Sequence, residues 1–343
     1  MFSSNPGHGL WDGLYPAFLA AVRFGYAAVP LRLVPTLEDW KGDCAPNKPL
    51  ACQAKLIMEQ FAGRGLIRHP ILKAHKAAGV PFYFERLIVG SGQKAQRWIQ
   101  TDLSIPGGRS LDGVRRYRDR MFWSHRMMYR PWVAKRTKGA IRAFVVDNKR
   151  YSASDKAALK QAIERLEEEG VQVEQMSWAA YWPFVKQLEV LGSSDIYITG
   201  PGTGMMLAPF MPDGSVVINL LSQRKCYGRT WPHPMEEYIL EGSPHLRALY
   251  YDSKERLTGF TADGLVKLIQ QAVNLTRTGF AIPVPKRTNL SPEARVLAEA
   301  CDLAPVTCSQ MVKEMNGGGP YQCVNDAWFS YPVYEVMRVV GMC

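Results

Sequence analysis

The sequence predicts an α/β protein whose second half holds a parallel sheet. From Gly139 onward, short apolar segments alternate with segments whose apolar residues recur at helical spacing. Glycine and proline residues separate these segments, as they do in chains built from βαβ units. Hydrophobic residues make up 47% of the 343 residues, so the chain can bury sizeable cores, and its length suits two domains.

The first half mixes helices with strands. The pattern predicts helices over residues 8–25, 53–61 and 70–78, strands over 31–34 and 82–89, and a loop at 41–50. Pro16 lies inside the first helix, where it removes a backbone donor and is expected to produce a kink. The strand over 82–89 is predicted because that run is apolar, has a high β propensity and ends at Gly90.

The second half is more regular. Strands are predicted over 141–146, 195–199 and 215–221, and a further strand is predicted to start at 171–173. Helices are predicted between Ser152 and Gly170 and over 178–190 and 259–274, and one or two helical turns over 205–210. Ser152 or Ser154 is expected to cap the first of these helices, and Gly170 to end it. Strands that alternate with helices predict right-handed crossovers and a parallel sheet. The segment after Ile282 is rich in Pro, Gly and Cys and is expected to be irregular.

The chain is basic, with a net charge of +11 and a pI of about 9.3, which favours an anionic partner. Between Arg109 and Arg150 the sequence contains thirteen Lys and Arg residues and three acidic residues. Trp123, Tyr129 and Trp132 are interleaved with these cations, a pattern that also suits single-stranded nucleic acid. A solvated basic face explains the same residues equally well.

Cysteine usage favours an oxidising compartment. The seven cysteines are Cys44, Cys52, Cys226, Cys301, Cys308, Cys323 and Cys343. Peripheral clusters of this kind are typical of disulfides in a secretory lumen, whereas reduced thiols would point to the cytoplasm. No apolar run approaches the ~20 residues of a membrane span. Any membrane attachment is therefore expected only through an N-terminal anchor outside this sequence.

A glycine loop is the first candidate site. Gly200, Gly202, Thr203 and Gly204 follow a predicted strand and precede a predicted helical turn. Glycines at such a position let backbone N–H groups approach a phosphate, and a helix N-terminus adds partial positive charge. The loop is neither a Walker loop, because no Lys follows, nor a full dinucleotide fingerprint, because Leu207 stands where a third glycine belongs. A purely structural turn remains an alternative.

A second candidate site lies near the start of the chain. His8 and Asp12 are four residues apart, so a helix would place both on one face. A carboxylate next to an imidazole can orient and charge it, and either group can act as a general base. The alternative is a polar start to a helix.

The chain contains no Asp-x-Asp pair, although enzymes that hold a nucleotide diphosphate through a divalent metal need closely spaced carboxylates. The histidines show no metal-binding spacing, so no metal site is predicted. Lys149 and Arg150 follow the first strand of the second half, where a βα loop faces a ligand. They are the cations expected to neutralise a bound phosphate, with ordinary surface charges as the alternative.

Three stretches together resemble the family 61 glycosyltransferases, which include N-acetylglucosaminyltransferases and plant xylosyltransferases. The first is Asn5-x-x-His8-x-x-x-Asp12, similar to the family motif near the start of its catalytic region. The second runs from Phe84 to Gly90 and is similar to a family strand that closes with Val-Gly. The third runs from Ser194 through Gly204 to Phe210-Met-Pro-Asp-Gly214. Order and spacing agree over roughly residues 5 to 250 and do not extend to the last part of the chain.

The resemblance implies a GT-B architecture, in which two Rossmann-like domains face each other across a cleft. The expected domains are an acceptor-side α/β domain over 1–135, a nucleotide-sugar-binding domain over 136–280 and an irregular tail over 281–343. The implied activity is metal-independent, inverting transfer from a nucleotide sugar, with UDP expected, to a glycan or glycoprotein hydroxyl, without a cofactor. The expected compartment, the Golgi or ER lumen, follows from the cysteine usage described above.

Two positions depart from the family pattern. The loop histidine of the family falls on Pro201, and the glutamate after its last strand falls on Asn219. These changes affect a contact to the diphosphate and one to the ribose or base. The alternatives are a module that binds nucleic acid or another polyanion through residues 109–150, and a nucleotide-sugar epimerase. The incomplete glycine fingerprint and the N-terminal motif argue against the epimerase.

Overall fold

A computed structural model describes most of both halves of the chain. The described residues are 7, 9–24, 26, 29–34, 49–67, 69–88, 110–127, 140–149, 151–178, 183–200, 202–220, 225–226, 229–230, 240, 243, 245–251 and 259–280. For some of these only the backbone is described, namely 12, 23, 49–52, 54, 69, 110–112, 225–226 and 229–230. The side chains of all seven cysteines and the predicted tail over 281–343 lie outside the described part.

The chain divides into two compact units. Unit 1 comprises Met1–Arg97, Thr101–Met128 and Pro285–Cys343, and unit 2 comprises Trp98–Gln100 and Tyr129–Val284. In the part of the chain that the structure describes, no helix is both long and apolar enough to cross a membrane.

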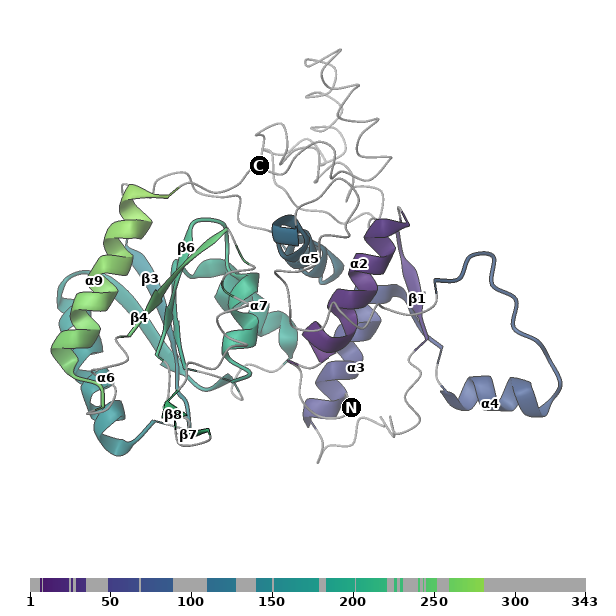
Figure 1. Ribbon diagram of the computed structural model, residues 1–343, viewed down its shortest axis with the longest axis horizontal. Helices are drawn as coiled ribbons and strands as arrows, with labels where there is room; N and C mark the ends of the chain where they lie inside the picture. The colour runs from purple at the N-terminus through teal and green to yellow at the C-terminus, as the bar shows by residue number, and fades with distance from the viewer. Residues whose placement is uncertain are drawn as a thin grey trace, which may run out of the picture. The chain divides into compact units, whose positions relative to one another are not determined.

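A five-stranded parallel sheet forms the centre of unit 2 (Figure 1). Its strands, in spatial order, are β4 (Val171–Met176), β3 (Ile141–Val146), β5 (Ile196–Thr199), β6 (Ser215–Asn219) and β9 (Leu246–Tyr250). Every neighbouring pair runs parallel. The α/β class and the parallel sheet predicted for the second half are therefore confirmed. Numbered along the chain, the spatial order is 2-1-3-4-5, one of the two common orders of doubly wound, Rossmann-like sheets.

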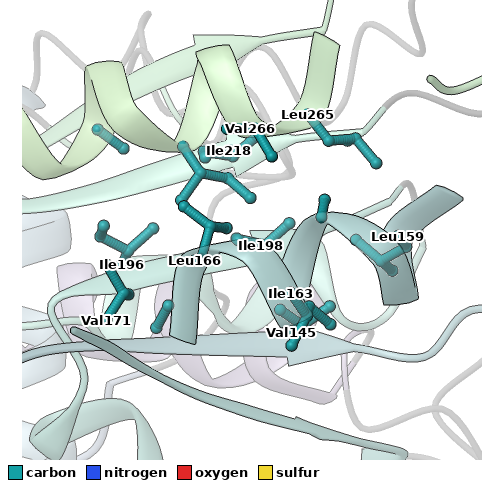
Figure 2. Packing of buried hydrophobic residues seen from close by; sticks show 14 of the residues in the cluster. Val145, Leu159, Ile163, Leu166, Val171, Ile196, Ile198, Ile218, Leu265 and Val266 are labelled. Carbon is teal, nitrogen blue, oxygen red and sulfur yellow. The ribbon is translucent and has the colours of Figure 1, made fainter. Parts of the chain in front are cut away.

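Helices cover both faces of this sheet. In Figure 1, α6 (Ala153–Glu168) and α9 (Ala262–Thr278) lie together on one side and α7 (Phe184–Ser193) lies on the other. Alternate residues of β3, β5 and β6 point toward α6 and α9, and Figure 2 shows Val145 beside Ile163 and Ile218 beside Leu166 and Val266. This apolar layer removes a large area from water and is the main source of stability in unit 2.

The ends of the helices follow local chemistry. Ser152 caps α6 with a capping box, because its hydroxyl accepts the N–H of Asp155 while the Asp155 carboxylate accepts the N–H of Ser152. Of the two serines considered from the sequence, Ser152 is thus the cap. Gly170 takes a φ of 80° just after α6, as predicted for a helix stop. Thr261 caps α9 by accepting the N–H of Gly264.

Several predicted boundaries are wrong for physical reasons. β4 begins at Val171, as predicted, and continues to Met176, because an edge strand tolerates the exposed polar residues that follow. α7 begins at Phe184 rather than 178, and Pro183 in extended geometry is its N-cap. β6 ends at Asn219 and α9 runs from Ala262 to Thr278. β9 was not predicted.

Unit 1 is mainly helical in its described part. Its elements are η1 (Gly9–Leu14), α2 (Tyr15–Arg23), β1 (Leu31–Leu33), α3 (Pro49–Ala62), β2 (Gly63–Leu66), α4 (His69–Ala77) and α5 (Ser110–Ser124). β1 and β2 form a parallel pair. The rings of Trp11, Tyr15, Phe18, Phe61 and Tyr117 contact one another at the centre of this unit.

Three predictions for unit 1 need correction. The helix over 8–25 is a π-helix followed by α2, and Pro16 lies in the first turn of α2, where its missing N–H costs little. α3 begins at Pro49, inside the predicted loop. The strand over 82–89 is wrong, since residues 80–88 have no regular structure. Phe82 instead stacks on His75 of α4, with ring centroids 4.1 Å apart, and a β propensity without a partner strand does not form a sheet.

Candidate functional site

The sheet order places the topological switch point of unit 2 between β3 and β5. In an open parallel sheet, ligands bind at the carboxyl ends of two neighbouring strands whose following helices go to opposite faces. β3 leads into α6 on one face, whereas β5 leads into η5 (Met205–Phe210), which packs with α7 on the other face through Phe210 and Phe184. The switch point of this sheet therefore lies between the loop after β3 and the loop after β5.

The loop after β3 is a tight turn. The Tyr151 N–H donates to the carbonyl oxygen of Asn148 at 3.0 Å, and the exposed Lys149 lies within the turn. Asp147 pairs with Lys156 of α6 at 3.0 Å. The carboxylate at the start of this loop is thus held by a cation of the helix that follows it.

The loop after β5 is the glycine loop, and hydrogen bonds hold both of its ends. The Thr199 hydroxyl donates to the carbonyl oxygen of Gly200 at 3.1 Å. At the other end, the Tyr197 hydroxyl donates to the carbonyl oxygen of Gly204 at 2.7 Å, and the indole N–H of Trp178 donates to the Tyr197 hydroxyl at 3.0 Å. These buried donors orient two carbonyl groups of the loop toward the sheet.

The two loops meet at Gly200. A Cβ atom at this position would lie 2.8 Å from the Tyr151 hydroxyl oxygen and 3.0 Å from the Asn148 side-chain nitrogen. Gly204 is similarly close to Thr199, whose hydroxyl would lie 2.9 Å from an added Cβ. A glycine is required at both positions for packing, independently of any ligand. Gly202 has a φ of 124°, a backbone conformation that side chains disfavour.

Burial controls the protonation of the two tyrosines at this edge. Desolvation raises the pKa of the Tyr151 hydroxyl far above its usual value, and Tyr197, Asp147 and Asp155 raise it further. Desolvation also raises the pKa of Tyr197, although hydrogen bonds from Trp178 and Thr199 oppose this shift. Both phenols are therefore neutral at physiological pH and keep a proton that can be donated.

Two buried polar side chains at the carboxyl edge have no hydrogen-bond partner among the described residues. One is Tyr151, whose hydroxyl lacks a partner and whose exposed fraction is 6%. The other is Asn219, which is fully buried at the end of β6 and whose amide oxygen and nitrogen both lack a partner among these residues. Buried polar groups are almost always paired, so each such group needs an explanation. Asn219 is in register with Thr199 and therefore lies on the α7 face of the sheet.

The structure brings together most of the predicted phosphate-binding residues. Gly200, Gly202, Thr203 and Gly204 form the loop after β5, and Lys149 lies on the facing loop after β3. Arg150, Pro201 and His8 lie outside the described residues. Asp12 lies in the π-helix η1 of unit 1, but its side chain is not among those described. The His8 and Asp12 pairing therefore stays a prediction.

The expected contribution of a helix N-terminus after the glycine loop needs revision. Residues 205–210 do form two helical turns, as predicted, but they are a 3-10 helix of six residues. So short a helix has little macrodipole, because few peptide units align. Any phosphate affinity of this loop has to come from individual N–H groups and from neighbouring donors.

Sequence reasoning missed the side chains that support the glycine loop. Tyr197 and Thr199 alternate with isoleucines along β5, and this alternation was a signal that two hydroxyl groups share one face of a buried strand. Trp178 is distant in sequence from the loop and had no such signal. Asn148 and Tyr151 follow β3 immediately, which is the position where ligand contacts are expected.

The basic stretch from Arg109 to Arg150 is largely a packing element in its described part. Its four arginines on α5 are buried, namely Arg115, Arg116, Arg118 and Arg120. Arg118 pairs with Asp119 at 2.7 Å, and Arg120 donates to two backbone carbonyl oxygens and lies over the ring of Trp123 at 4.4 Å. These cations do not form an exposed face.

Among the described residues, no group of three or more His, Cys, Asp or Glu side chains is placed to hold a metal ion. No protein-family model matches the chain, and comparison with curated proteins gives no match either.

Proposed function

We propose that this protein is a glycosyltransferase that moves a sugar from a nucleotide-sugar donor, a UDP-sugar, to a hydroxyl of a glycan or glycoprotein acceptor. The observation that carries the proposal is the position of the glycine loop at the switch point of a 2-1-3-4-5 sheet, opposite the turn that bears Lys149. Sheets of this order bind phosphorylated ligands at that point. The motifs quoted above add the resemblance to family 61.

In this proposal the donor diphosphate lies against Gly202, Thr203 and Gly204, where small residues let the backbone approach closely. Lys149 and Arg150 neutralise the charge that develops on the leaving diphosphate, in place of a metal ion. The tethered ends of the loop favour binding, because little conformational entropy is lost when the loop is already ordered.

The acceptor side of the proposal rests on the sequence. Asp12 or His8 removes the proton from the acceptor hydroxyl as the sugar is transferred with inversion. A GT-B arrangement would align donor and acceptor in line, which is the main requirement of such a displacement. Both residues belong to unit 1, whereas the donor loop belongs to unit 2.

Burial of the α5 arginines makes the alternative, a module that binds nucleic acid through residues 109–150, less favourable. Phosphate contacts require cations that reach the ligand, and each contact adds to the salt dependence of binding. A protein with buried arginines in this stretch lacks part of that surface.

A thermal-shift screen with UDP, GDP, CMP and ADP, each with and without EDTA, tests the proposal. A ligand at a hundred times its Kd stabilises the folded state by about 2.7 kcal/mol, so specific binding is easily seen. We expect UDP to raise the melting temperature, and EDTA to leave that shift unchanged.

Matched lysine variants place the binding at the switch point. Lys149→Ala should weaken UDP binding about fivefold, which corresponds to about 1 kcal/mol. Lys160→Ala, on the exposed surface of α6, should have no effect. The proposal fails if no nucleotide shifts the melting temperature, or if both lysine variants bind UDP as tightly as the unmodified protein.

A further inference from the structure

Exposed apolar side chains are concentrated in residues 70–88 of unit 1, which comprise most of α4 and the segment that follows it. The described part of the chain exposes nine large hydrophobic residues, and five of them belong to this stretch: Ile71, Val80, Tyr83, Phe84 and Leu87. Tyr83 is 90% exposed and Leu87 is 55% exposed. None of residues 70–88 is buried. Single exposed apolar residues are normal, whereas a concentration of them indicates an interaction surface.

Contacts within the stretch hold these side chains in place. Gly79 takes a φ of 67° just after α4, and the N–H of Val80 donates to the carbonyl oxygen of His75 at 2.9 Å. The ring of Phe82 then stacks on His75, and its centroid lies 6.0 Å from that of Phe84. The helix and the segment after it therefore present their apolar groups together.

The far end of the stretch is attached to the residues after α2. The guanidinium of Arg86 donates to the hydroxyl of Tyr26 at 2.9 Å and lies over the same ring, 5.4 Å from its centroid. Arg86 is thus engaged inside unit 1. Leu87 follows it directly and stays exposed.

α4 has an apolar side and a basic side. Ile71 and Ala74 are three residues apart and share one side, and Lys73 and Lys76, also three apart, share another. All four are exposed. Neither lysine has a partner for its charge among the described residues. In Figure 1, α4 stands apart from the other helices of unit 1, so its surface is open to a partner.

The charge of the stretch indicates the chemistry of that partner. Residues 70–88 contain three Lys or Arg residues and one acid, Glu85. An anionic surface would therefore complement them. α4 has nine residues, far fewer than the ~20 that cross a bilayer, so it can lie on a membrane but cannot span one. Aromatic and aliphatic side chains beside lysines are the composition of segments that bind at the boundary of headgroups and acyl chains.

We propose that residues 70–88 bind the surface of an anionic lipid bilayer. Tyr83, Phe84 and Leu87 enter the boundary between headgroups and acyl chains, where a tyrosine buries its ring and keeps its hydroxyl in water. Lys73 and Lys76 contact anionic headgroups, and their aliphatic stems lie along the apolar side chains. This attachment needs no anchor outside the sequence, which was the only route expected from the absence of a long apolar run.

Co-sedimentation of the full chain with vesicles of phosphatidylcholine, with and without phosphatidylserine, tests the proposal. We expect binding to the vesicles that contain phosphatidylserine and much weaker binding to phosphatidylcholine alone, because the lysines then lack anionic partners. Binding should weaken as the salt concentration rises. The proposal is overturned if the chain does not sediment with the anionic vesicles.

Two pairs of substitutions locate the binding. Replacing Lys73 and Lys76 by alanine should weaken it about thirtyfold, since each cation near the surface contributes about fivefold. Replacing Tyr83 and Leu87 by serine should weaken it at least about tenfold, because their apolar area no longer leaves water. All four side chains are exposed, so the melting temperature should not change.

A matched pair controls for total charge. Lys160→Ala together with Lys267→Ala removes the same charge from exposed positions of α6 and α9, and this variant should bind as the unmodified chain does. The proposal is overturned if both lysine pairs weaken binding equally, since a general attraction would then explain it. It is also overturned if the serine variant binds as tightly as the unmodified chain.

Amide hydrogen exchange identifies what covers the stretch. Vesicles with phosphatidylserine should slow exchange over residues 70–88 and leave α6 unchanged. If exchange over 70–88 instead slows with rising protein concentration and not with vesicles, a second copy of the chain covers this surface and the proposal is wrong. Both measurements are independent of whether a nucleotide binds at the loop after β5.

Discussion

Replacing Tyr197 with phenylalanine is the most direct test of how the glycine loop is held. The Tyr197 hydroxyl accepts the indole N–H of Trp178 and donates to the carbonyl oxygen of Gly204. The residue is fully buried, so the substitution removes one oxygen atom and leaves the packing of the ring with Phe144 intact. Any change in stability then reports on the hydrogen bonds of this hydroxyl.

The expected loss is about 2 kcal/mol in the free energy of unfolding. Each hydrogen bond contributes about 1 kcal/mol net, and a buried group left unpaired adds to the loss. Two features limit that addition. The Gly204 oxygen keeps the N–H of Leu207 at 3.1 Å, and Trp178 is partly exposed, so its indole N–H can bind water.

Tyr151→Phe is the matched control, because it removes the same atom from a buried tyrosine whose hydroxyl has no partner among the described residues. This variant should lose no stability. Equilibrium urea unfolding of the two variants measures the difference, and amide hydrogen exchange over residues 202–207 should accelerate only in Tyr197→Phe. Equal losses of stability in the two variants, or unchanged exchange in Tyr197→Phe, would refute the assigned hydrogen bonds.

Four further predictions follow from buried or crowded groups. Burial lowers the pKa of His125 to about 4, below its unfolded value of about 6.5, despite a hydrogen bond with a backbone carbonyl that raises it. Its contribution to the free energy of unfolding, at most about 3 kcal/mol, should be complete above pH 6.5 and be lost as the pH falls toward 4. Urea unfolding of His125→Gln at different pH values should lack this pH dependence. Gly200→Ala should lower the free energy of unfolding by about 1–3 kcal/mol, because the new methyl group meets the Tyr151 hydroxyl. The loss should be smaller when Tyr151 is also replaced by phenylalanine, and a double-mutant cycle measures this coupling. Asn219→Leu should raise the free energy of unfolding by about 1–3 kcal/mol, because it removes two buried amide atoms that have no partner in the described part of the chain; a lower melting temperature would mean that they are paired. Asp155→Ala should lower the free energy of unfolding by about 1 kcal/mol at pH 7, because the capping box of α6 is lost, and thermal unfolding measures this loss. Below the pKa of the Asp155 carboxyl, the substitution should no longer change the stability.

Much of unit 2 was predictable because its signals are local. β3 is a continuous apolar run, and buried parallel strands have this pattern. The start and end of α6 follow from Ser152, Asp155 and Gly170, which act within one turn of the helix. β9 was missed because its sequence, Leu-Arg-Ala-Leu-Tyr, is neither a continuous apolar run nor a regular alternation of apolar and polar residues.

In unit 1 local signals were weaker guides. The run over 82–89 has the composition of a strand, but residues 80–88 form none, because strands depend on a partner that the local sequence does not specify. The basic stretch was interpreted as a surface feature, yet Arg118 is fully buried beside Asp119. Charge composition does not show which cations are paired inside the protein.

By itself, the sequence determined the alternation of strands and helices in the second half, the caps of α6 and the glycine loop after β5, because periodicity, capping and turn chemistry act between residues close in the chain. Only the tertiary structure decided the order of the strands. That order places the turn after β3 beside the loop after β5 and brings Tyr151 and Asn148 onto Gly200, about fifty residues away. Contacts over such separations depend on how strands pair and helices pack across the whole sheet, which no local pattern encodes.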